Sequence, residues 1–203
     1  MNSMHVIHEA LNFVLEKLNL PTIEAKLLGK KAGRPLTEIL KEKIPEIETS
    51  TIRKVEKEFY RKYLEVSFSK CRPFPEVKQV LEQLILRGFK LAIVTTTPRI
   101  PVERDLTRFG LKRYFNAIIT REDVKNYKPS PEVLLKATNL LNVKMDECVL
   151  VGDSPIDIKT GKASGVKTIA VLTGLCGEEA LRKEKPDWII RKLDELLEIL
   201  EKI

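Results

Sequence analysis

The most constraining feature of this chain is a regular alternation, from residue 73 onward, of short apolar runs and longer amphipathic stretches. The apolar runs lie at 89–94, 117–120, 148–152, 167–172 and 187–190. Continuous apolar runs of this length are typical of strands buried on both faces of a parallel sheet. Because helical patterns separate these strands, the alternation predicts an α/β domain whose mostly parallel sheet carries helices on both faces.

The amphipathic stretches predict the helices of this domain. Helices are expected to end at Gly88, to cover 101–109, 131–141 and 155–164, and to close the chain. Ser130 is expected to cap the helix in which Pro131 takes the first position. In the closing helix, a buried stripe is expected at Leu193, Leu196, Leu197 and Leu200.

The first third of the chain has a different pattern. Apolar residues recur at helical spacing over 5–18, 23–31, 35–43 and 50–66, with Ser3 placed to cap the first helix. No stretch in this third favours a strand. The chain is therefore predicted to contain a small helical domain over 5–70 and an α/β domain over 71–203, a division that suits its length of 203 residues.

The charge balance narrows the classes of partner. The formal net charge is +7, and a positive surface can attract either nucleic acid or small anionic substrates. No run of Lys and Arg forms a basic tail, and aromatic residues are not interleaved with the charges. A small anionic substrate is therefore the expected partner, and nucleic acid is not expected.

The location of the protein is inferred from three patterns. No apolar stretch approaches the ~18 residues of a membrane span. The N-terminus lacks the charged start and apolar core of a signal peptide. The three cysteines, at 71, 148 and 176, lie far apart, which argues against a disulfide framework. We therefore expect a cytoplasmic protein with no membrane association, as a monomer or a homodimer.

Polar residues that suit phosphate chemistry follow three of the predicted strands. Thr95 and Thr96 end the first strand, Lys128 follows the second, and Asp153 and Asp157 follow the third. In parallel sheets, ligands bind beyond the carboxyl ends of the strands. There, hydroxyl and backbone N–H groups can hold phosphoryl oxygens and an ammonium can neutralise developing charge. Paired carboxylates suit Mg²⁺.

Each of these residues also has an ordinary structural explanation. Thr95 is of a type that favours strands, and Lys128 before a proline suits a solvent-facing loop. Asp153 is of a type that caps helices, and Asp157 is favourable in a helix's first turn. Gly152 is expected to allow a sharp turn of the backbone beneath a metal. For Thr95 and Lys128 alone the structural explanation is preferred, whereas the ordered set favours a phosphate and metal site.

The ordered set resembles the haloacid dehalogenase superfamily, and within it the phosphoglycolate phosphatase-like branch. The matching segments are Val-Thr-Thr at 94–96, Lys-Pro-Ser-Pro-Glu at 128–132, Val-Gly-Asp-Ser at 151–154 with Asp157, Gly-Lys-Ala-Ser-Gly-Val at 161–166 and Val-Leu-Thr-Gly at 171–174. The segment around Asp153 is the most specific of them. The resemblance covers nearly the whole chain and implies a Rossmann-like core in which the helical domain over 5–70 is a cap.

The resemblance implies a Mg²⁺-dependent phosphatase that acts on a small phosphorylated metabolite such as phosphoglycolate. In this comparison, Thr95, Thr96 and Lys128 bind phosphate, and Thr95 and Lys128 take part in catalysis. Asp153 and Asp157 hold the metal. Arg34 of the cap is a candidate contact for the substrate, although a solvated face is the more ordinary explanation for its charge.

The chain departs from the family at its start. Such enzymes begin with a strand that ends in Asp-x-Asp-Gly-Thr, whereas residues 1–4 align just after that motif. The expected nucleophile, which would form an aspartyl-phosphate, therefore lies upstream of Met1, and the chain as written is expected to be inactive. A central strand would also be missing between the strands that end at Thr95 and Asp153. The alternative hypothesis is a complete, non-catalytic binding protein.

Overall fold

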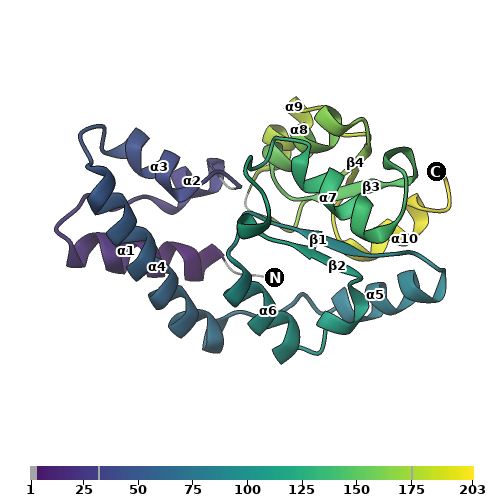
Figure 1. Ribbon diagram of the computed structural model, residues 1–203, viewed down its shortest axis with the longest axis horizontal. Helices are drawn as coiled ribbons and strands as arrows, with labels where there is room; N and C mark the ends of the chain where they lie inside the picture. Colours follow the sequence, from purple (N-terminus) through teal and green to yellow (C-terminus); the bar gives the residue numbers. More distant parts are fainter. Residues whose placement is uncertain (1–3, 32, 175) are drawn as a thin grey trace. The chain divides into compact units, whose positions relative to one another are not determined.

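The computed structural model describes residues 4–31, 33–174 and 176–203 and divides into two compact units (Figure 1). The first unit is Met1–Phe74 and the second is Pro75–Ile203. The domain boundary predicted from the sequence was 70/71. The expected cap at Ser3 and most of the predicted remnant at 1–4 lie outside the described residues, while Met4 begins the first helix.

Among the described residues of the first unit, all the regular secondary structure is helical, as predicted. Its helices are α1 (Met4–Lys17), α2 (Ala25–Lys30), α3 (Leu36–Lys43) and α4 (Thr49–Lys70). Helices α1 and α4 pack together through fully buried side chains such as Leu11, Leu15, Ile52 and Val55. Helix α4 continues to Lys70, four residues beyond the predicted end, because Val66 and Ser67 are also buried.

The second unit alternates strands and helices in the predicted order. Its strands are β1 (Ala92–Val94), β2 (Ala117–Ile119), β3 (Val149–Gly152), β4 (Lys167–Val171) and β5 (Trp188–Ile190). Its helices are α5 (Val77–Leu86), α6 (Arg99–Arg108), α7 (Glu132–Leu141), α8 (Pro155–Ser164), α9 (Glu178–Lys183) and α10 (Leu196–Ile199). Short 3₁₀ turns lie at Lys112–Tyr114, Arg121–Asp123, Met145–Glu147 and Leu193–Glu195.

The strands form two parallel sheets instead of one. Strand β1 pairs with β2, and the second sheet has the order β3-β4-β5. Within the part of the chain that the structure describes, β1 and β3 belong to different sheets. The predicted parallel pairing is therefore confirmed, and the break falls between the two strands where the family resemblance implied a missing strand.

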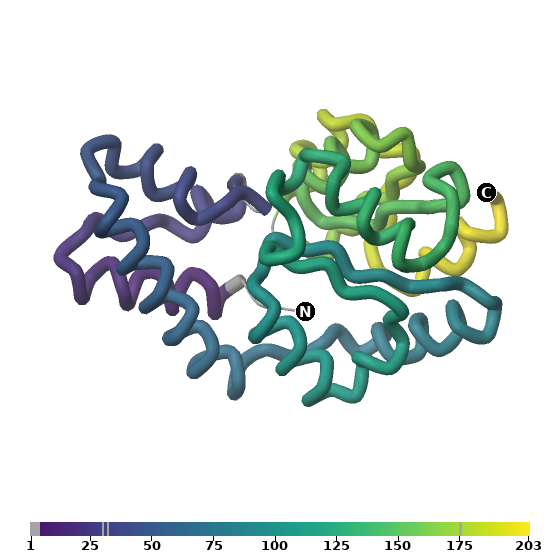
Figure 2. Tube along the Cα trace, viewed as in Figure 1, coloured from purple at the N-terminus to yellow at the C-terminus, as the bar shows by residue number. Residues whose placement is uncertain are grey.

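Two apolar clusters cover opposite faces of these strands. Residues of α7 and Leu150 of β3 form one cluster, against which Ala92 and Val94 pack. Residues of α5 and α10 form the other, against which Val149 and Val151 pack. Neighbouring residues of β3 thus face different clusters, as expected for a strand buried on both faces. Figure 2 traces the chain of this unit from one strand or helix to the next.

Several local expectations differ from the structure. Helix α7 begins at Glu132 with Pro131 as its N-cap residue, so the prediction that Ser130 caps the helix was wrong. Ser130 Oγ instead accepts a 3.3 Å bond from the Glu132 N–H. The closing helix is short because a 3₁₀ turn takes up its first residues, and helix α9 was not predicted. Helix α8 ends at Gly165, as expected, with a φ of 71°.

Among the described residues, no helix has both the length and the apolar character needed to cross a bilayer.

Candidate active site at the carboxyl ends of β1 and β3

Lys128 joins the end of β1 to the start of α8. Its Nζ donates to the Val94 carbonyl oxygen at 2.7 Å and to Asp157 Oδ1 at 2.8 Å. Only 9% of Lys128 and 8% of Asp157 is exposed, so this ion pair is buried. Removing a charged group from water costs free energy. For the Lys128 ammonium, the opposite charge of Asp157 and the Val94 carbonyl offset this cost. Lys128 is therefore part of a polar cluster, and the prediction of a solvent-facing lysine does not hold.

Asp157 is held in place by the residue that caps its helix. Ser154 donates to Asp157 Oδ2 from its hydroxyl at 2.6 Å and from its backbone N–H at 3.1 Å. The Asp157 N–H donates in return to Ser154 Oγ at 3.4 Å. This capping box satisfies backbone donors at the start of α8 and fixes the carboxylate within the helix's first turn. Asp157 is thus both a helix-start residue and the partner of Lys128.

Two glycines make room for the carboxylates. A Cβ at Gly152 would lie 2.3 Å from Asp157 Cβ, and a Cβ at Gly174 would lie 2.4 Å from Asp153 Cβ. Either approach is closer than any ordinary packing contact. Gly152 was expected to permit a sharp turn, but it is not among the residues with positive φ. Its function is steric: the lack of a side chain lets Asp157 pack against the end of β3.

Asp153 has a different environment from Asp157. It follows β3 directly and keeps contact with solvent, while protein atoms surround much of its carboxylate. This partial burial, together with the like charge of Asp157, raises the pKa of Asp153 above its ordinary value. Lys128 opposes this effect. The nearby charge of Asp157 disfavours the ionised form of Asp153, and a bound cation would stabilise that form.

Thr95 and Thr96 follow β1 at the same end of the unit. The Thr95 N–H donates to the Ile119 carbonyl at 2.9 Å, which continues the ladder between β1 and β2. Thr95 Oγ1 accepts a bond from the Thr97 N–H at 3.1 Å, so the hydroxyl helps to shape the turn after the strand. Both threonines are half-buried. They adjoin Val94, whose carbonyl binds Lys128.

Arg34 lies in the first unit and forms an ion-pair cluster of its own. Its guanidinium contacts Glu38 and Glu42, each at 3.0 Å. Lys31 also pairs with Glu42. Hydrogen bonding to Glu38 is the main cause that raises the pKa of Arg34, and bonding to Lys31 and then Arg34 lowers the pKa of Glu42. The predicted substrate contact of Arg34 remains a prediction.

The carboxylates of Asp153 and Asp157 have the chemistry of ligands for a divalent cation. The described residues contain no cluster of three or more His, Cys, Asp or Glu side chains placed to hold a metal. Asp153 and Asp157 provide a smaller donor set. A carboxylate offers about four lone-pair sites, and Asp157 uses three of them on Lys128 and Ser154. One site of Asp157 and the carboxylate of Asp153 therefore suit a cation that keeps several waters, as Mg²⁺ does.

Three residues of this region were not assigned a role from the sequence. Ser154 orients Asp157, and the Ser-x-x-Asp spacing of a capping box was a visible signal for it. Gly174 ends the Val-Leu-Thr-Gly segment that carried part of the family resemblance, but that segment did not indicate a contact with Asp153. Cys176 is buried, and this burial, with the nearby Asp153 and Asp157 charges, raises the pKa of its thiol to about 11. Its proximity to the carboxylates arises only from folding.

Comparison with protein families gives an independent result. The model of the haloacid dehalogenase-like hydrolase family matches residues 1–171. That span includes the first unit, most of the second unit and the predicted site residues Arg34, Thr95, Thr96, Lys128, Asp153 and Asp157, while Gly174 and Cys176 lie beyond it.

Known relatives and solved structures extend this comparison. The chain is 39% identical over 169 residues to "Pyrophosphatase PpaX" of Halalkalibacterium halodurans, covering 83% of this chain and 76% of that protein. It is 42% identical over 127 residues to "Pyrophosphatase PpaX" of Bacillus pumilus, covering 63% and 59%. A crystal structure described as a predicted phosphoglycolate phosphatase from Haemophilus somnus superposes with a TM-score of 0.88 at 24% identity, covering 98% of this chain and 92% of that one.

Proposed function

The chain belongs to the haloacid dehalogenase-like hydrolase family. We therefore propose that it is a Mg²⁺-dependent phosphatase. Its phosphate site is the cluster at the carboxyl ends of β1 and β3. The observation that carries this proposal is the buried contact of Lys128 with Asp157, 2.8 Å long, near the charge of Asp153, a residue that keeps contact with solvent. A fixed ammonium and paired carboxylates at one edge of parallel strands suit a phosphoryl group with its cation.

Each residue has a defined part in this proposal. Thr95, Thr96 and the backbone N–H groups that follow β1 bind phosphoryl oxygens. Lys128 adds a positive charge that is already oriented by Val94 and Asp157 and therefore needs little rearrangement during the reaction. Asp153 and Asp157 hold Mg²⁺, and Ser154 keeps Asp157 in position. A bound Mg²⁺ supplies positive charge to the phosphoryl oxygens.

The attacking group is a separate part of the proposal. Asp153 and Asp157 are assigned to the cation, so a further carboxylate, an aspartate by resemblance to the family, attacks phosphorus to form an aspartyl-phosphate. The leaving group departs with the electron pair of its bond to phosphorus, and water then hydrolyses the intermediate.

Two substrates are favoured by different observations. The proteins that are 39% and 42% identical bear the name pyrophosphatase, which favours inorganic pyrophosphate. The sequence motifs favoured a phosphomonoester such as phosphoglycolate. We place pyrophosphate first because two relatives of 39% and 42% identity bear that name, whereas phosphoglycolate rests on short motifs. Arg34 remains a candidate contact for the second anionic group of either substrate.

Activity is tested with the protein expressed from its native gene, including any residues that precede Met1. Phosphate release from pyrophosphate and from phosphoglycolate is measured with and without Mg²⁺. We expect Mg²⁺-dependent release, faster from pyrophosphate. The absence of Mg²⁺-dependent release from these and from a broad panel of small phosphate esters would contradict the proposal.

The metal site is tested by binding, without reference to activity. Residues 1–203 and the variant Asp153→Asn are titrated with Mg²⁺ in the presence of orthophosphate, by calorimetry. Asp153→Asn is expected to lose Mg²⁺ binding while it remains folded. Thr107→Val, an exposed change in α6, is the control and should bind as the parent does. Equal Mg²⁺ binding by parent and Asp153→Asn would rule out the assignment of Asp153.

A second candidate function is binding of a phosphate-sized anion without catalysis. It needs only the groups proposed to bind phosphate, which are the Lys128 ammonium and the turn that follows β1, and it needs no nucleophile. Tight orthophosphate binding by the native-gene protein, with no turnover of any ester in the panel, would support this second function instead of the first.

A further inference from the structure

Gly174 follows β4 and lies against the carboxylate of Asp153. A Cβ added at Gly174 would lie 2.4 Å from Cβ and from Oδ2 of Asp153, and 2.6 Å from its Cγ. Real side chains essentially never approach so closely, so the carboxylate of Asp153 fills the space that a side chain at residue 174 would take. Gly174 is not among the residues with positive φ, so its backbone conformation does not itself require glycine. The contact with Asp153 does.

The segment that carries Gly174 is held in place by the sheet. Strands β3 and β4 are parallel and remain paired to Gly152, the last residue of β3, so the residues that follow the two strands lie near each other. On the other side of β4, the Leu172 N–H donates at 2.9 Å to the carbonyl of Ile190 in β5, which extends that ladder beyond the strand. A backbone anchored by two neighbouring strands therefore presents Gly174 to Asp153.

The two carboxylates of the site are restrained in different ways. Asp157 accepts hydrogen bonds from Lys128 at Oδ1 and from Ser154 at Oδ2. Asp153 has the backbone of Gly174 against one side of its carboxylate, and Oδ2 is the oxygen nearer to it. Each carboxylate can therefore turn only within narrow limits, one because of hydrogen bonds and the other because of a close backbone contact.

Restrained carboxylates can distinguish one divalent cation from another. Mg²⁺ requires near-ideal octahedral geometry, with ligand oxygens at about 2.0–2.1 Å. Ca²⁺ accepts about six to eight oxygens in a flexible arrangement, often with both oxygens of one carboxylate. A carboxylate that is held in one orientation therefore suits Mg²⁺ better than Ca²⁺, and a carboxylate that is displaced or free to turn loses this preference.

We propose that Gly174 is a positioning residue whose backbone holds the Asp153 carboxylate in the orientation that Mg²⁺ requires, so that the site selects Mg²⁺ over Ca²⁺. A larger residue at 174 would displace this carboxylate. Mg²⁺ tolerates distortion of its ligands less well than Ca²⁺ does, so the affinity for Mg²⁺ would fall further. This inference rests on the proposed function, in which Asp153 is a ligand of the cation.

The test compares the protein expressed from its native gene with its variant Gly174→Ala. Each is titrated separately with Mg²⁺ and with Ca²⁺ in the presence of orthophosphate, and calorimetry gives the two Kd values. In Gly174→Ala, the Kd for Mg²⁺ should rise by about tenfold or more, as is common when a group that orients a metal ligand is changed. The Kd for Ca²⁺ should rise by less than about threefold. Partial unfolding would weaken both ions alike, so the ratio of the two Kd values is the readout.

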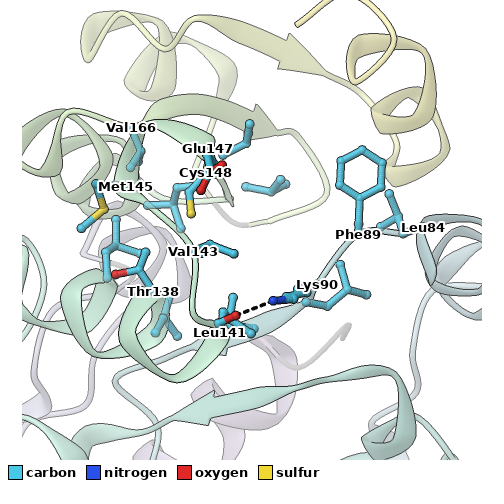
Figure 3. A pocket seen from close by; sticks show the side chains of 18 of the residues that line it. Leu84, Phe89, Lys90, Thr138, Leu141, Val143, Met145, Glu147, Cys148 and Val166 are labelled. Atoms are coloured by element: carbon cyan, nitrogen blue, oxygen red, sulfur yellow. Dashed lines mark hydrogen bonds between the residues drawn. The ribbon is translucent and has the colours of Figure 1, made fainter. Parts of the chain in front are cut away.

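Two control variants separate positioning from packing. Gly177→Ala also lies between β4 and α9, but no atom lies within 4 Å of its added Cβ, and it should change neither Kd. Val166→Ala removes buried side-chain atoms at the other end of β4, where Val166 lines an apolar pocket (Figure 3). It should lower the unfolding temperature and leave both Kd values as they are. A changed ratio of the Kd values in either control would overturn the proposal.

If Gly174→Ala does not fold, Asp153→Glu takes its place. This variant keeps the negative charge, but its additional methylene group moves the carboxylate away from Gly174, and the same selective loss of Mg²⁺ affinity is expected. An unchanged ratio of the two Kd values would overturn the positioning by Gly174 and leave the proposed function intact, provided that the parent binds Mg²⁺ and Asp153→Asn does not. Equal affinity of the parent for Mg²⁺ and Ca²⁺ would have the same meaning. A parent that binds no Mg²⁺ would overturn both.

Discussion

The two units each contain an ion-pair cluster around one basic residue, and the two clusters differ in burial and in hydrogen bonding. In the second unit, Lys128 and Asp157 are both about nine-tenths buried, and Asp157 is also bonded to Ser154. In the first unit, Arg34 contacts Glu38 and Glu42, whose side chains are 53% and 54% exposed.

The difference shows that an ion pair gains structural importance from its surroundings. Exposed pairs contribute little, because water screens them and holding long side chains together costs entropy. A buried pair is not a strong net source of stability either, but loss of one partner leaves a charge without compensation. Lys128 should therefore be sensitive to substitution, and Arg34 should not.

The largest expected effect is that of Lys128→Ala. This change leaves the buried Asp157 carboxylate without its cation and should lower the free energy of unfolding of the second unit by about 3–5 kcal/mol. Denaturant unfolding followed by Trp188 fluorescence measures it. Lys159→Ala removes an exposed lysine paired with Glu184 at 3.3 Å and is the control. A loss below about 1 kcal/mol for Lys128→Ala would show that water replaces the ammonium.

The next effect is that of Gly152→Ala. The new methyl group would lie 2.3 Å from Asp157 Cβ, so the carboxylate must move or the strand end must shift, at a cost of about 1–3 kcal/mol. The same unfolding experiment measures this cost. Gly177→Ala is the matched control, because no atom lies within 4 Å of its added Cβ and its φ of −59° suits alanine. If the two variants unfolded alike, the packing of Asp157 on Gly152 would not matter for stability.

A smaller effect is expected for Asp153→Asn, and its sign is opposite. The pKa of Asp153 is raised in the folded state, so the unfolded chain loses this proton at a lower pH than the folded one. The contribution of Asp153 to the free energy of unfolding therefore falls as the pH rises from the ordinary pKa of an aspartate to the raised pKa of the folded state. Asparagine removes that loss, and the variant should be more stable above this window by under about 1 kcal/mol, because the residue is exposed.

Thermal unfolding of parent and Asp153→Asn across pH measures this difference. The two curves should coincide at pH values below the ordinary pKa and separate as pH rises. Saturating Mg²⁺ should stabilise the parent and leave Asp153→Asn unchanged. A variant that is less stable than the parent at neutral pH without Mg²⁺ would contradict the effect of burial and of Asp157 on the pKa of Asp153.

The smallest effect is expected for Arg34→Ala. Removal of its two exposed contacts should change the stability of the helical unit by less than about 1 kcal/mol, and added salt should reduce the difference further. Loss of helical circular dichroism on heating, at low and at high salt, measures it. A large loss that salt does not reduce would mean that Arg34 belongs to a buried network.

Much of the fold could be predicted because its signals are local. The period of the apolar residues predicted a helical first third and alternating strands and helices afterwards. The Gly165 position predicted the end of α8. The resemblance to the haloacid dehalogenase superfamily also implied the position of the break between the strands that end near Thr95 and Asp153. The start of α7, just after Ser130 and Pro131, was mispredicted because several N-cap arrangements fit the same residues.

The candidate site could be predicted only in part. Residue types and strand ends placed Thr95, Lys128, Asp153 and Asp157 at one sheet edge, as parallel strands require. The sequence did not indicate that Lys128 would bind Asp157, because the two are 29 residues apart and meet only through the packing of β1, β3 and α8. Nor did it show that Gly174 packs on Asp153.

The sequence by itself determined the helical first unit, the α/β order of the second and the residues that end its strands, because periodicity and turn residues act over a few positions. Only the tertiary structure decided which strand edges are paired, which carboxylate is buried with Lys128 and which keeps contact with solvent. Those properties depend on contacts between distant segments, where burial and the backbone of neighbouring strands set the energy of each charge and each hydrogen bond.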